Sequence, residues 1–286
     1  MDMQLTTLKV APLPGPVGVD IAGIDLRDQL PADEIAKIKQ AWYGHLVLRF
    51  RGQSLSDHDL VRFTKQLGLL DRAPKRSATE HLDTPESAHV LTISNVLENG
   101  KPIGELGDAE AWWHQDMTYH ATPPVGAALY ALEVPPSGGN TEFCNLYEAY
   151  ETLPEATRQK IDGLTCVHDI SLDSSGRARK GYSPTTDAAH AQGPEHPLVL
   201  THPRTGRKHL YLGRRPFANI PSLPIDESEA LLDELWSHAT QRKFKWTQEW
   251  KVGDLIIWDN RCTMHRRDSF DSASRRVMHR TQLADD

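Results

Sequence analysis

Short apolar runs closed by proline or glycine turns are the feature that most limits how this chain can fold. They include LVLRF (46–50), GAALYALEV (126–134) and GDLIIWDN (253–260). The turn PPSGG (135–139) follows one of them, since proline presets φ and glycine supplies φ > 0. Many short strands, with helices at the front and in insertions, predict an α+β fold with a barrel-like or jelly-roll β core.

Helices and further strands are predicted from periodicity and capping residues. Helices are expected at 33–42, ended by Gly44, at 57–66, begun by Ser56 with Asp59, at 148–162 and at 227–239. Further strands are expected at 89–96, 140–146, 244–250 and 276–283, with a hairpin at 197–213 that turns at 203–206. The polar stretch 173–193 is long for a loop and predicts a lid, mobile or partly ordered by a ligand. Without a repeat or an internal boundary, residues 1–286 are expected to form a single domain.

Composition excludes several classes of protein. The 286 residues suffice for a large core, with 38% hydrophobic and 25% charged residues. A net charge of −7 argues against nucleic-acid binding, although local basic groups could still hold a small anion. We see no signal peptide and no apolar run long enough to cross a membrane. Three scattered cysteines (Cys144, Cys166 and Cys262) fit buried thiols in a reducing compartment, so a cytoplasmic location is expected.

His114 and Asp116 form an H-x-D unit, and in an extended segment both side chains would point to the same side. His265, expected just after the apolar strand of GDLIIWDN, offers a third ligand. Two imidazoles and one carboxylate on one face are typical of non-haem iron(II) sites that leave positions open for a co-substrate and O₂. The chain has 14 histidines, and the pattern alone is as compatible with surface or core histidines.

The surrounding motifs carry a more specific signal. The chain contains WHQD (113–116), GGNT (138–141), WDNRCTMH (258–265), and then Arg276 and Arg280. In this order they resemble the taurine dioxygenase / 2,4-dichlorophenoxyacetate dioxygenase family of Fe(II)/2-oxoglutarate-dependent oxygenases. The beginning of the chain (GVDIAGIDLRD, HLVLRF) is also similar to that family, so the resemblance covers nearly all of it.

The resemblance implies a fold and a set of site residues. The implied fold is a double-stranded β-helix, a jelly-roll, cupin-like core. His114, Asp116 and His265 match the iron ligands, whereas Thr141 and Arg276 match the residues that hold the distal carboxylate of 2-oxoglutarate. Arg280 matches a basic residue that holds the acidic group of the substrate in several members.

Residue chemistry agrees with these implied roles. A planar, permanently charged guanidinium suits a carboxylate. Alternation along RRVMHR directs Arg276 and Arg280 to one face of a strand, towards one cavity. Tyr119, close after Asp116, is a further candidate for substrate contact. His202 and Arg214 are weaker candidates for the pocket mouth, and Asp259, Asn260 and Arg261 are expected to shape the turn before His265 or to support the ligands.

The expected function is therefore that of an enzyme, an oxidoreductase that binds Fe(2+) and uses 2-oxoglutarate and O₂ as co-substrates. It would hydroxylate an unactivated C–H bond of a small, acidic substrate (a sulfonate, an aryloxyalkanoate or another carboxylate), with heteroatom cleavage as a second outcome. Three alternatives stay open: a hydroxylase or desaturase of secondary metabolism that acts on an amino acid or a carrier-bound substrate, a cupin-like zinc hydrolase or isomerase, and a non-catalytic binding protein. The expected partner is a small acidic molecule, with neither nucleic acid nor membrane, and a homo-oligomer is compatible with the sequence.

Overall fold

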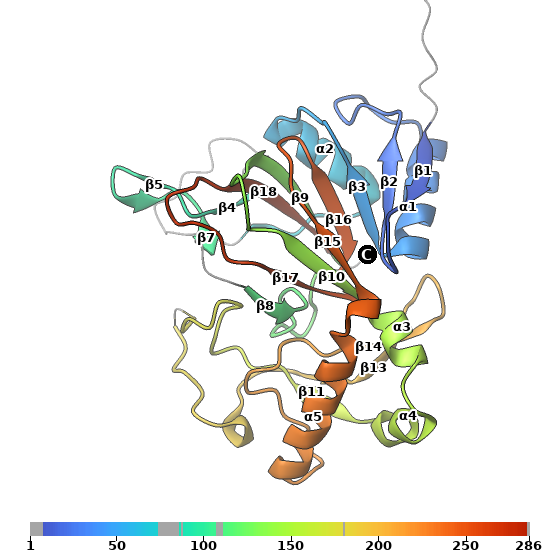
Figure 1. Cartoon of the computed structure of the whole chain (residues 1–286), viewed down its shortest axis with the longest axis vertical. Helices are drawn as coiled ribbons and strands as arrows, with labels where there is room; N and C mark the ends of the chain where they lie inside the picture. Colours follow the sequence, from blue (N-terminus) through green and yellow to red (C-terminus); the bar gives the residue numbers. More distant parts are fainter. Residues whose placement is uncertain (1–7, 74–85, 87, 107–110, 180, 285–286) are drawn as a thin grey trace, which may run out of the picture.

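Two mainly antiparallel sheets lie at the centre of the protein (Figure 1). This computed structural model describes residues 8–73, 86, 88–106, 111–179 and 181–284. The larger sheet has, in spatial order, β1 (Lys9–Pro12), β2 (Val19–Ala22), β3 (Val47–Phe50), β16 (Leu255–Asp259), β9 (Gly126–Glu133), β18 (Val277–Leu283), β4 (Leu91–Ser94) and β7 (Glu105–Leu106). The smaller sheet has β15 (Lys245–Gln248), β10 (Thr141–Asn145), β17 (Thr263–Arg267) and β8 (Ala111–His114). Two opposed sheets of this kind match the predicted jelly-roll core.

The larger sheet is buried on both faces, which explains the continuous apolar runs in its central strands. Ala127 and Leu129 of β9 join a core cluster with Phe143 of the smaller sheet. Ala128 and Tyr130, which alternate with them, pack in a second cluster with the helices α1 (Ala32–His45) and α2 (Asp57–Leu67). Alternate side chains of β9 thus pack against the smaller sheet on one face and against the helices on the other face.

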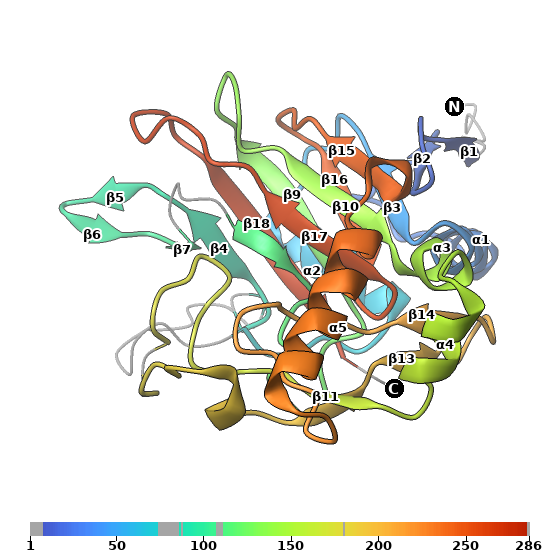
Figure 2. The same ribbon diagram turned by 60° about the horizontal axis from the view of Figure 1, so that its bottom comes forward.

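A third core cluster covers the outer face of the smaller sheet. It contains Cys144 of β10 and Met264 of β17 together with residues of α3 (Leu146–Glu151) and α5 (Ile225–Ala239), and Figures 1 and 2 show α5 beside that sheet. The remaining elements of the described residues are α4 (Glu155–Ile161), the short helices η1 (Ala188–His190) and η2 (Arg242–Phe244), and three two-stranded sheets. These sheets pair β5 (Leu97–Glu98) with β6 (Lys101–Pro102), β11 (Thr165–Val167) with β12 (Glu195–Pro197), and β13 (Val199–Thr201) with β14 (Lys208–Leu210).

Two predicted helix boundaries were wrong. The first helix continues past Gly44 to His45 and ends where Leu46 adopts a positive φ of 68°. The helix predicted at 148–162 is two helices, because Pro154 lacks a backbone N–H and begins a new helix instead of continuing the old one. The capping box of Ser56 and Asp59 is confirmed at the start of α2.

The strand β17 was missed, and it carries His265. We expected His265 after a strand, but it lies in the middle of β17, paired with Phe143 and with His114. The H-x-D unit likewise ends strand β8 instead of preceding a strand. The sequence TMHRR hid β17 because its inward positions carry polar side chains where an apolar alternation would be expected.

Gly126 allows α1 to pack closely on the larger sheet. A Cβ atom at this position would lie 2.5 Å from the Trp42 indole and 2.8 Å from the Trp258 carbonyl oxygen. We therefore expect Gly126→Ala to lower the free energy of unfolding by about 1–3 kcal/mol, because both neighbours are buried and cannot move aside. Urea unfolding measures this loss, with Gly44→Ala, at a helical position of α1 where a Cβ would meet nothing, as the control for a glycine substitution. Equal losses in the two variants would contradict the expectation.

The three cysteines are free and buried, as predicted. Within the described ranges, none of the helices has the length and apolar character needed to span a membrane.

Candidate metal centre and active site

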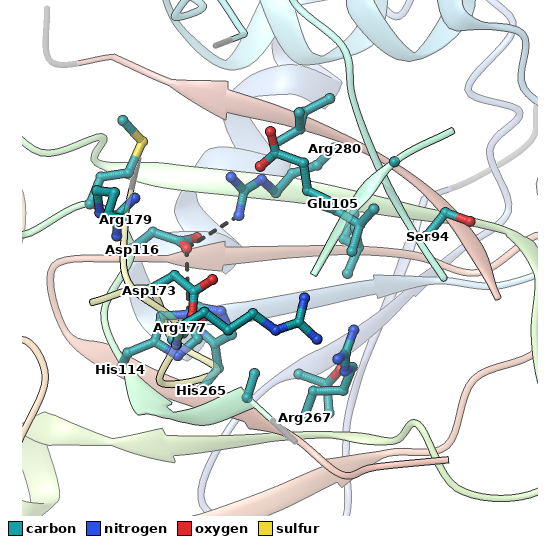
Figure 3. A pocket seen from close by; sticks show the side chains of 18 of the residues that line it. Ser94, Glu105, His114, Asp116, Asp173, Arg177, Arg179, His265, Arg267 and Arg280 are labelled. Carbon is teal, nitrogen blue, oxygen red and sulfur yellow. Dashed lines mark hydrogen bonds and ion pairs between the residues drawn. The ribbon is translucent and has the colours of Figure 1, made fainter. Parts of the chain in front are cut away.

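His114, Asp116 and His265 lie together at the open end between the sheets (Figure 3). Their potential ligand atoms lie within 4.8 Å of one another, and His114 Nε2 is 3.6 Å from Asp116 Oδ1. The backbone pairing of His265 with His114 brings the two strands into register. All three side chains are buried. The structure thus brings together the three residues that the sequence predicted as metal ligands.

The electrostatics of this cluster suit a divalent cation. Burial alone would raise the pKa of Asp116, but the positive charge of Arg280 and the neighbouring imidazoles of His265 and His114 lower it well below its usual range. Burial, followed by the charge of His114, lowers the pKa of His265 to about 3, so its imidazole is neutral and keeps a lone pair. Asp116 Oδ2 is buried and has no hydrogen-bond partner among the described residues. An anionic oxygen and a neutral imidazole are the forms that a metal ion requires.

Hydrogen bonds fix the orientation of the ligands. His114 Nδ1 lies 2.6 Å from the Trp112 carbonyl oxygen, which leaves Nε2 free to face Asp116. The side chain of Asn260 holds the backbone on both sides of Asp116: Oδ1 accepts from Asp116 N (2.7 Å), and Nδ2 donates to Asp116 O (2.9 Å) and Pro124 O (2.9 Å). The predicted supporting role of Asn260 is confirmed in this form.

Gln115, the middle residue of H-x-D, has a role that sequence reasoning missed. Its Nε2 donates to the carbonyl oxygens of Asn260 and Arg261, and its Oε1 accepts from the backbone of Leu212 and Gly213. It therefore ties the segment after β14 to the loop before β17. No local signal marks such a residue, because its partners are distant in sequence.

Asn260→Ala is expected to weaken metal binding about 10–100-fold, the range found for residues that orient ligands. The change removes three hydrogen bonds to the backbone around Asp116 but no ligand atom. Anaerobic titration with Fe(II) measures the affinity. Asn95→Ala is a matched control, since Asn95 binds backbone groups near residues 272–276 rather than Asp116. Wild-type affinity in Asn260→Ala would contradict the positioning role.

A cavity of about 740 Å³ opens beside the three residues, and Thr141 and Arg276 line it as predicted. Arg276 is 2% exposed, and within the described part of the chain its guanidinium has no hydrogen-bond or ion-pair partner. Burial and the nearby charge of Arg267 lower the pKa of Arg276 to about 9. Thr141 Oγ1 accepts a hydrogen bond from Trp250 Nε1 (3.0 Å), which leaves its proton available. A buried cation and a hydroxyl donor without an anion form a site that suits a carboxylate.

The other predicted pocket residues divide into two groups. Tyr119, Arg214 and Arg280 line the cavity. His202 does not: it is buried elsewhere, with Nε2 3.0 Å from Asp259 Oδ2, so its assignment to the pocket mouth was wrong. The reason is that Asp259, itself paired with Arg261, holds His202 beneath the turn that follows β16.

The residues His202, Asp259 and Cys262 also form a compact group of potential ligands. Arg261 already neutralises Asp259, with Nη2 at 2.5 Å from Oδ2 and Nε at 2.9 Å from Oδ1. Burial raises the pKa of the Cys262 thiol well above its usual value. We interpret this group as the structural support of the turn, in line with the predicted role of Asp259 and Arg261.

Part of the predicted lid, 173–193, lies over the cavity. The backbone N–H groups of Ser175 and Arg177 and the Ser175 hydroxyl all donate to Asp173 Oδ1, which closes a tight turn. Gly176, at a φ of 80°, lies against Trp112, where a Cβ atom would be 2.6 Å from the indole. Residues of this turn and of the chain just after it line the cavity: Asp173, Ser174, Arg177, Ala178 and Arg179. The two arginines were not predicted, since nothing in their local sequence distinguishes them from solvent-exposed charges.

His168 lies behind the site, against Gly213, and gives a testable dependence of stability on pH. Burial, then the charges of His196 and Arg214, lower its pKa to about 3, against about 6.5 in an unfolded chain. Between these values the unfolded chain binds more protons than the folded one, so the folded state loses stability as the pH falls below 6.5. At pH 5 the loss from His168 is about 2 kcal/mol. We expect the decrease in unfolding free energy from pH 7 to pH 5 to be smaller by about this amount in His168→Phe.

Urea unfolding at the two pH values measures the difference. His190→Phe, which changes an exposed histidine, should behave like the wild type. An unchanged decrease in His168→Phe would show that His168 does not titrate as described.

The comparisons with known proteins agree with this geometry. The profile of the family "Taurine catabolism dioxygenase TauD, TfdA family" matches residues 9–282. An alpha-ketoglutarate-dependent 2,4-dichlorophenoxyacetate dioxygenase from Cupriavidus pinatubonensis (strain JMP 134 / LMG 1197) is 35% identical over 276 residues, which cover 93% of this chain and 94% of that protein. Pentalenolactone F synthase from Streptomyces arenae is 32% identical, over 95% of this chain and 93% of the synthase. The crystal structure of AAD-2 in complex with Mn(II) and N-oxalylglycine superposes with a TM-score of 0.79 at 31% identity, over 97% of both chains.

The chain belongs to the TauD/TfdA family. It is a 2-oxoglutarate-dependent dioxygenase with the jelly-roll fold of that family, and the family implies Fe(II), 2-oxoglutarate and O₂. The predicted fold class and enzyme class are confirmed. Its relatives act on small molecules such as aryloxyalkanoates.

Proposed function

We propose that this dioxygenase hydroxylates an unactivated C–H bond of a small anionic molecule, with iron(II) held by His114, Asp116 and His265. The observation that carries the proposal is the buried triad beside a cavity that also contains the unpaired Arg276. A zinc hydrolase or isomerase would not require a buried, unpaired arginine such as Arg276 in the cavity beside its metal site. Family membership favours the dioxygenase over that alternative and over a non-catalytic binding protein.

The protein's own residues bind and orient the reactants. Thr141 and Arg276 hold the distal carboxylate of 2-oxoglutarate, which directs its other end towards the triad. Bound iron would supply oxygen activation coupled to the oxidative decarboxylation of 2-oxoglutarate to succinate and CO₂. Trp258 and Phe143 pack against His265, with ring centroids 4.9 Å and 5.9 Å away, and exclude water from that side of the metal.

Substrate contact through Tyr119 and Arg280 stays a prediction. Both line the cavity, but Arg280 Nη1 also donates to Asp116 Oδ1 at 3.2 Å. The charge balance supports an anionic substrate, since arginines outnumber carboxylates along the cavity wall. If the hydroxylated carbon carries a heteroatom, its product would break down, and the net reaction would be cleavage.

The similarity to pentalenolactone F synthase favours a second candidate function, oxidation in secondary metabolism. The two candidates share the metal site and differ in the substrate. A panel of sulfonates, aryloxyalkanoates, amino acids and neutral lactones, scored by substrate-stimulated succinate release, discriminates between them. Stimulation by neutral lactones alone would favour the second candidate.

The metal and co-substrate sites are tested by anaerobic addition of Fe(II) and 2-oxoglutarate. We expect the weak visible charge-transfer band of the chelate in the wild type and its loss in His114→Ala. His190→Ala, which removes an exposed histidine, is the matched control and should keep the band. An undiminished band in His114→Ala, or none in the wild type, would falsify the proposed site.

A further inference from the structure

Arg214 is a buried cation beside the triad for which the mechanism above has no use. It follows β14, and its backbone pairs with that of His114, so its side chain begins next to a proposed ligand. The residue is 7% exposed. Its Nη1 donates to the Leu172 carbonyl oxygen, while its Nε is buried without a partner. Throughout the described ranges, no carboxylate forms an ion pair with it.

Arg179 places a second guanidinium at the same point. Its Nη2 donates to the same Leu172 carbonyl oxygen (3.2 Å), its Nε donates to Ile170 O (3.1 Å), and its Nη1 donates to the Tyr119 hydroxyl (3.0 Å). Its central carbon lies 3.8 Å from the centroid of the Tyr119 ring. Two like charges therefore share one neutral acceptor, and burial together with Arg179 lowers the pKa of Arg214 to about 10. This arrangement is costly unless an anion completes it.

The nearby carboxylates do not complete it. Asp116 is already paired with Arg280 and is a proposed metal ligand. Asp169 accepts hydrogen bonds from Ser171, Thr185 and Gln192, and the Asp173 side chain closes its own turn. Tyr119, since its oxygen accepts from Arg179, can donate its proton towards the cavity that it lines.

We propose that Tyr119, Arg179 and Arg214 form the subsite for the anionic head group of the substrate, a carboxylate or a sulfonate. This inference rests on the proposed function and deepens it. The head group would lie beside His114, which brings the carbon atoms next to it close to the metal. Arg280, which the sequence favoured as the anchor, lines the same cavity and stays a predicted contact of that head group.

Two substitutions of Arg214 test the subsite. Arg214→Met keeps the volume of the side chain but removes the charge, and Arg214→Lys restores a charge. The test uses 2,4-dichlorophenoxyacetate, an aryl-methanesulfonate and the neutral amide of the first compound, with Fe(II) and 2-oxoglutarate present. We measure the KM for stimulation of succinate release and, without oxygen, the Kd from the change in the chelate band.

For the better anionic probe we expect Arg214→Met to raise KM and Kd at least about 10-fold, the loss of one charge-assisted hydrogen bond. The neutral amide should be unaffected, and Arg214→Lys should recover part of the affinity. The carboxylate and the sulfonate arms show which head group the subsite prefers. Arg27→Gln, which removes a charge from an exposed pair with Asp25, is the control for net charge.

The chelate band separates this inference from the proposed function. If Arg214→Met keeps the band and its 2-oxoglutarate affinity, the metal and co-substrate sites are intact, and a change in probe affinity belongs to the subsite. Unchanged affinity for both anions in Arg214→Met overturns the inference while the proposed function stands. A wild-type enzyme that binds neither anion better than the amide overturns it as well. Absence of the band in the wild type overturns the proposed function itself.

Discussion

Asp116→Asn is expected to lower 2-oxoglutarate turnover at least about 100-fold, more than the loss of a residue that only orients a ligand. The substitution keeps the shape of the side chain but removes the negative charge that faces His114 and His265. It also removes the partner of Arg280, at 3.2 Å, so a partly buried cation is left without its carboxylate. Anaerobic titration with Fe(II) and succinate release measure the loss.

Asp187→Asn is the matched control for Asp116→Asn, because Asp187 is exposed and pairs only with His190. Circular dichroism of both variants shows whether the fold is kept. If Asp116→Asn held Fe(II) as tightly as the wild type, the triad would not be the metal site.

Arg276→Met is expected to raise the Kd for 2-oxoglutarate about 100–1000-fold. A guanidinium that donates two charge-assisted hydrogen bonds to one carboxylate contributes about 3–4 kcal/mol, which corresponds to this range. Titration of the chelate band with 2-oxoglutarate measures the Kd. Arg275→Met is the control: Arg275 is the neighbouring residue, exposed, and paired with Glu133.

Stability measurements give Arg276→Met a second, opposite readout. Without 2-oxoglutarate, Arg276 is a buried charge close to Arg267, and this environment lowers its pKa to about 9. We therefore expect the thermal midpoint of the ligand-free variant to equal or exceed that of the wild type, while stabilisation by added 2-oxoglutarate is lost. A lower midpoint combined with normal 2-oxoglutarate affinity would mean that Arg276 is structural.

The sequence predicted the residues whose spacing is local. His114 and Asp116 are two positions apart, and Arg276 and Arg280 are four apart, directly before and within β18, so the period of an extended chain was enough to direct each pair to one side. His265 was identified from its motif, although the strand that contains it was missed. The jelly-roll core was predicted from many short strands separated by proline and glycine turns, and from the family resemblance.

Contacts between distant segments could not be predicted in this way. Arg179 and Arg214 converge on the carbonyl oxygen of Leu172, and a backbone acceptor has no signature in the sequence. Asn260 was expected to shape the turn or to support the ligands, but its actual partner could not be predicted, since Asp116 lies 144 positions away. His202 was placed at the pocket mouth because it lies in the predicted hairpin, whereas burial beside Asp259 decides its position.

The three hydrogen bonds of Asn260 bear on how a metal ion enters the protein. They fix the Asp116 segment to the loop before His265 through protein groups alone. The donor atoms therefore need little rearrangement, and metal uptake should be a simple bimolecular association whose rate grows in proportion to ion concentration, with no slow conformational phase. A coordination sphere that adapts so little also discriminates between divalent ions by their preferred geometry more than by their intrinsic affinity.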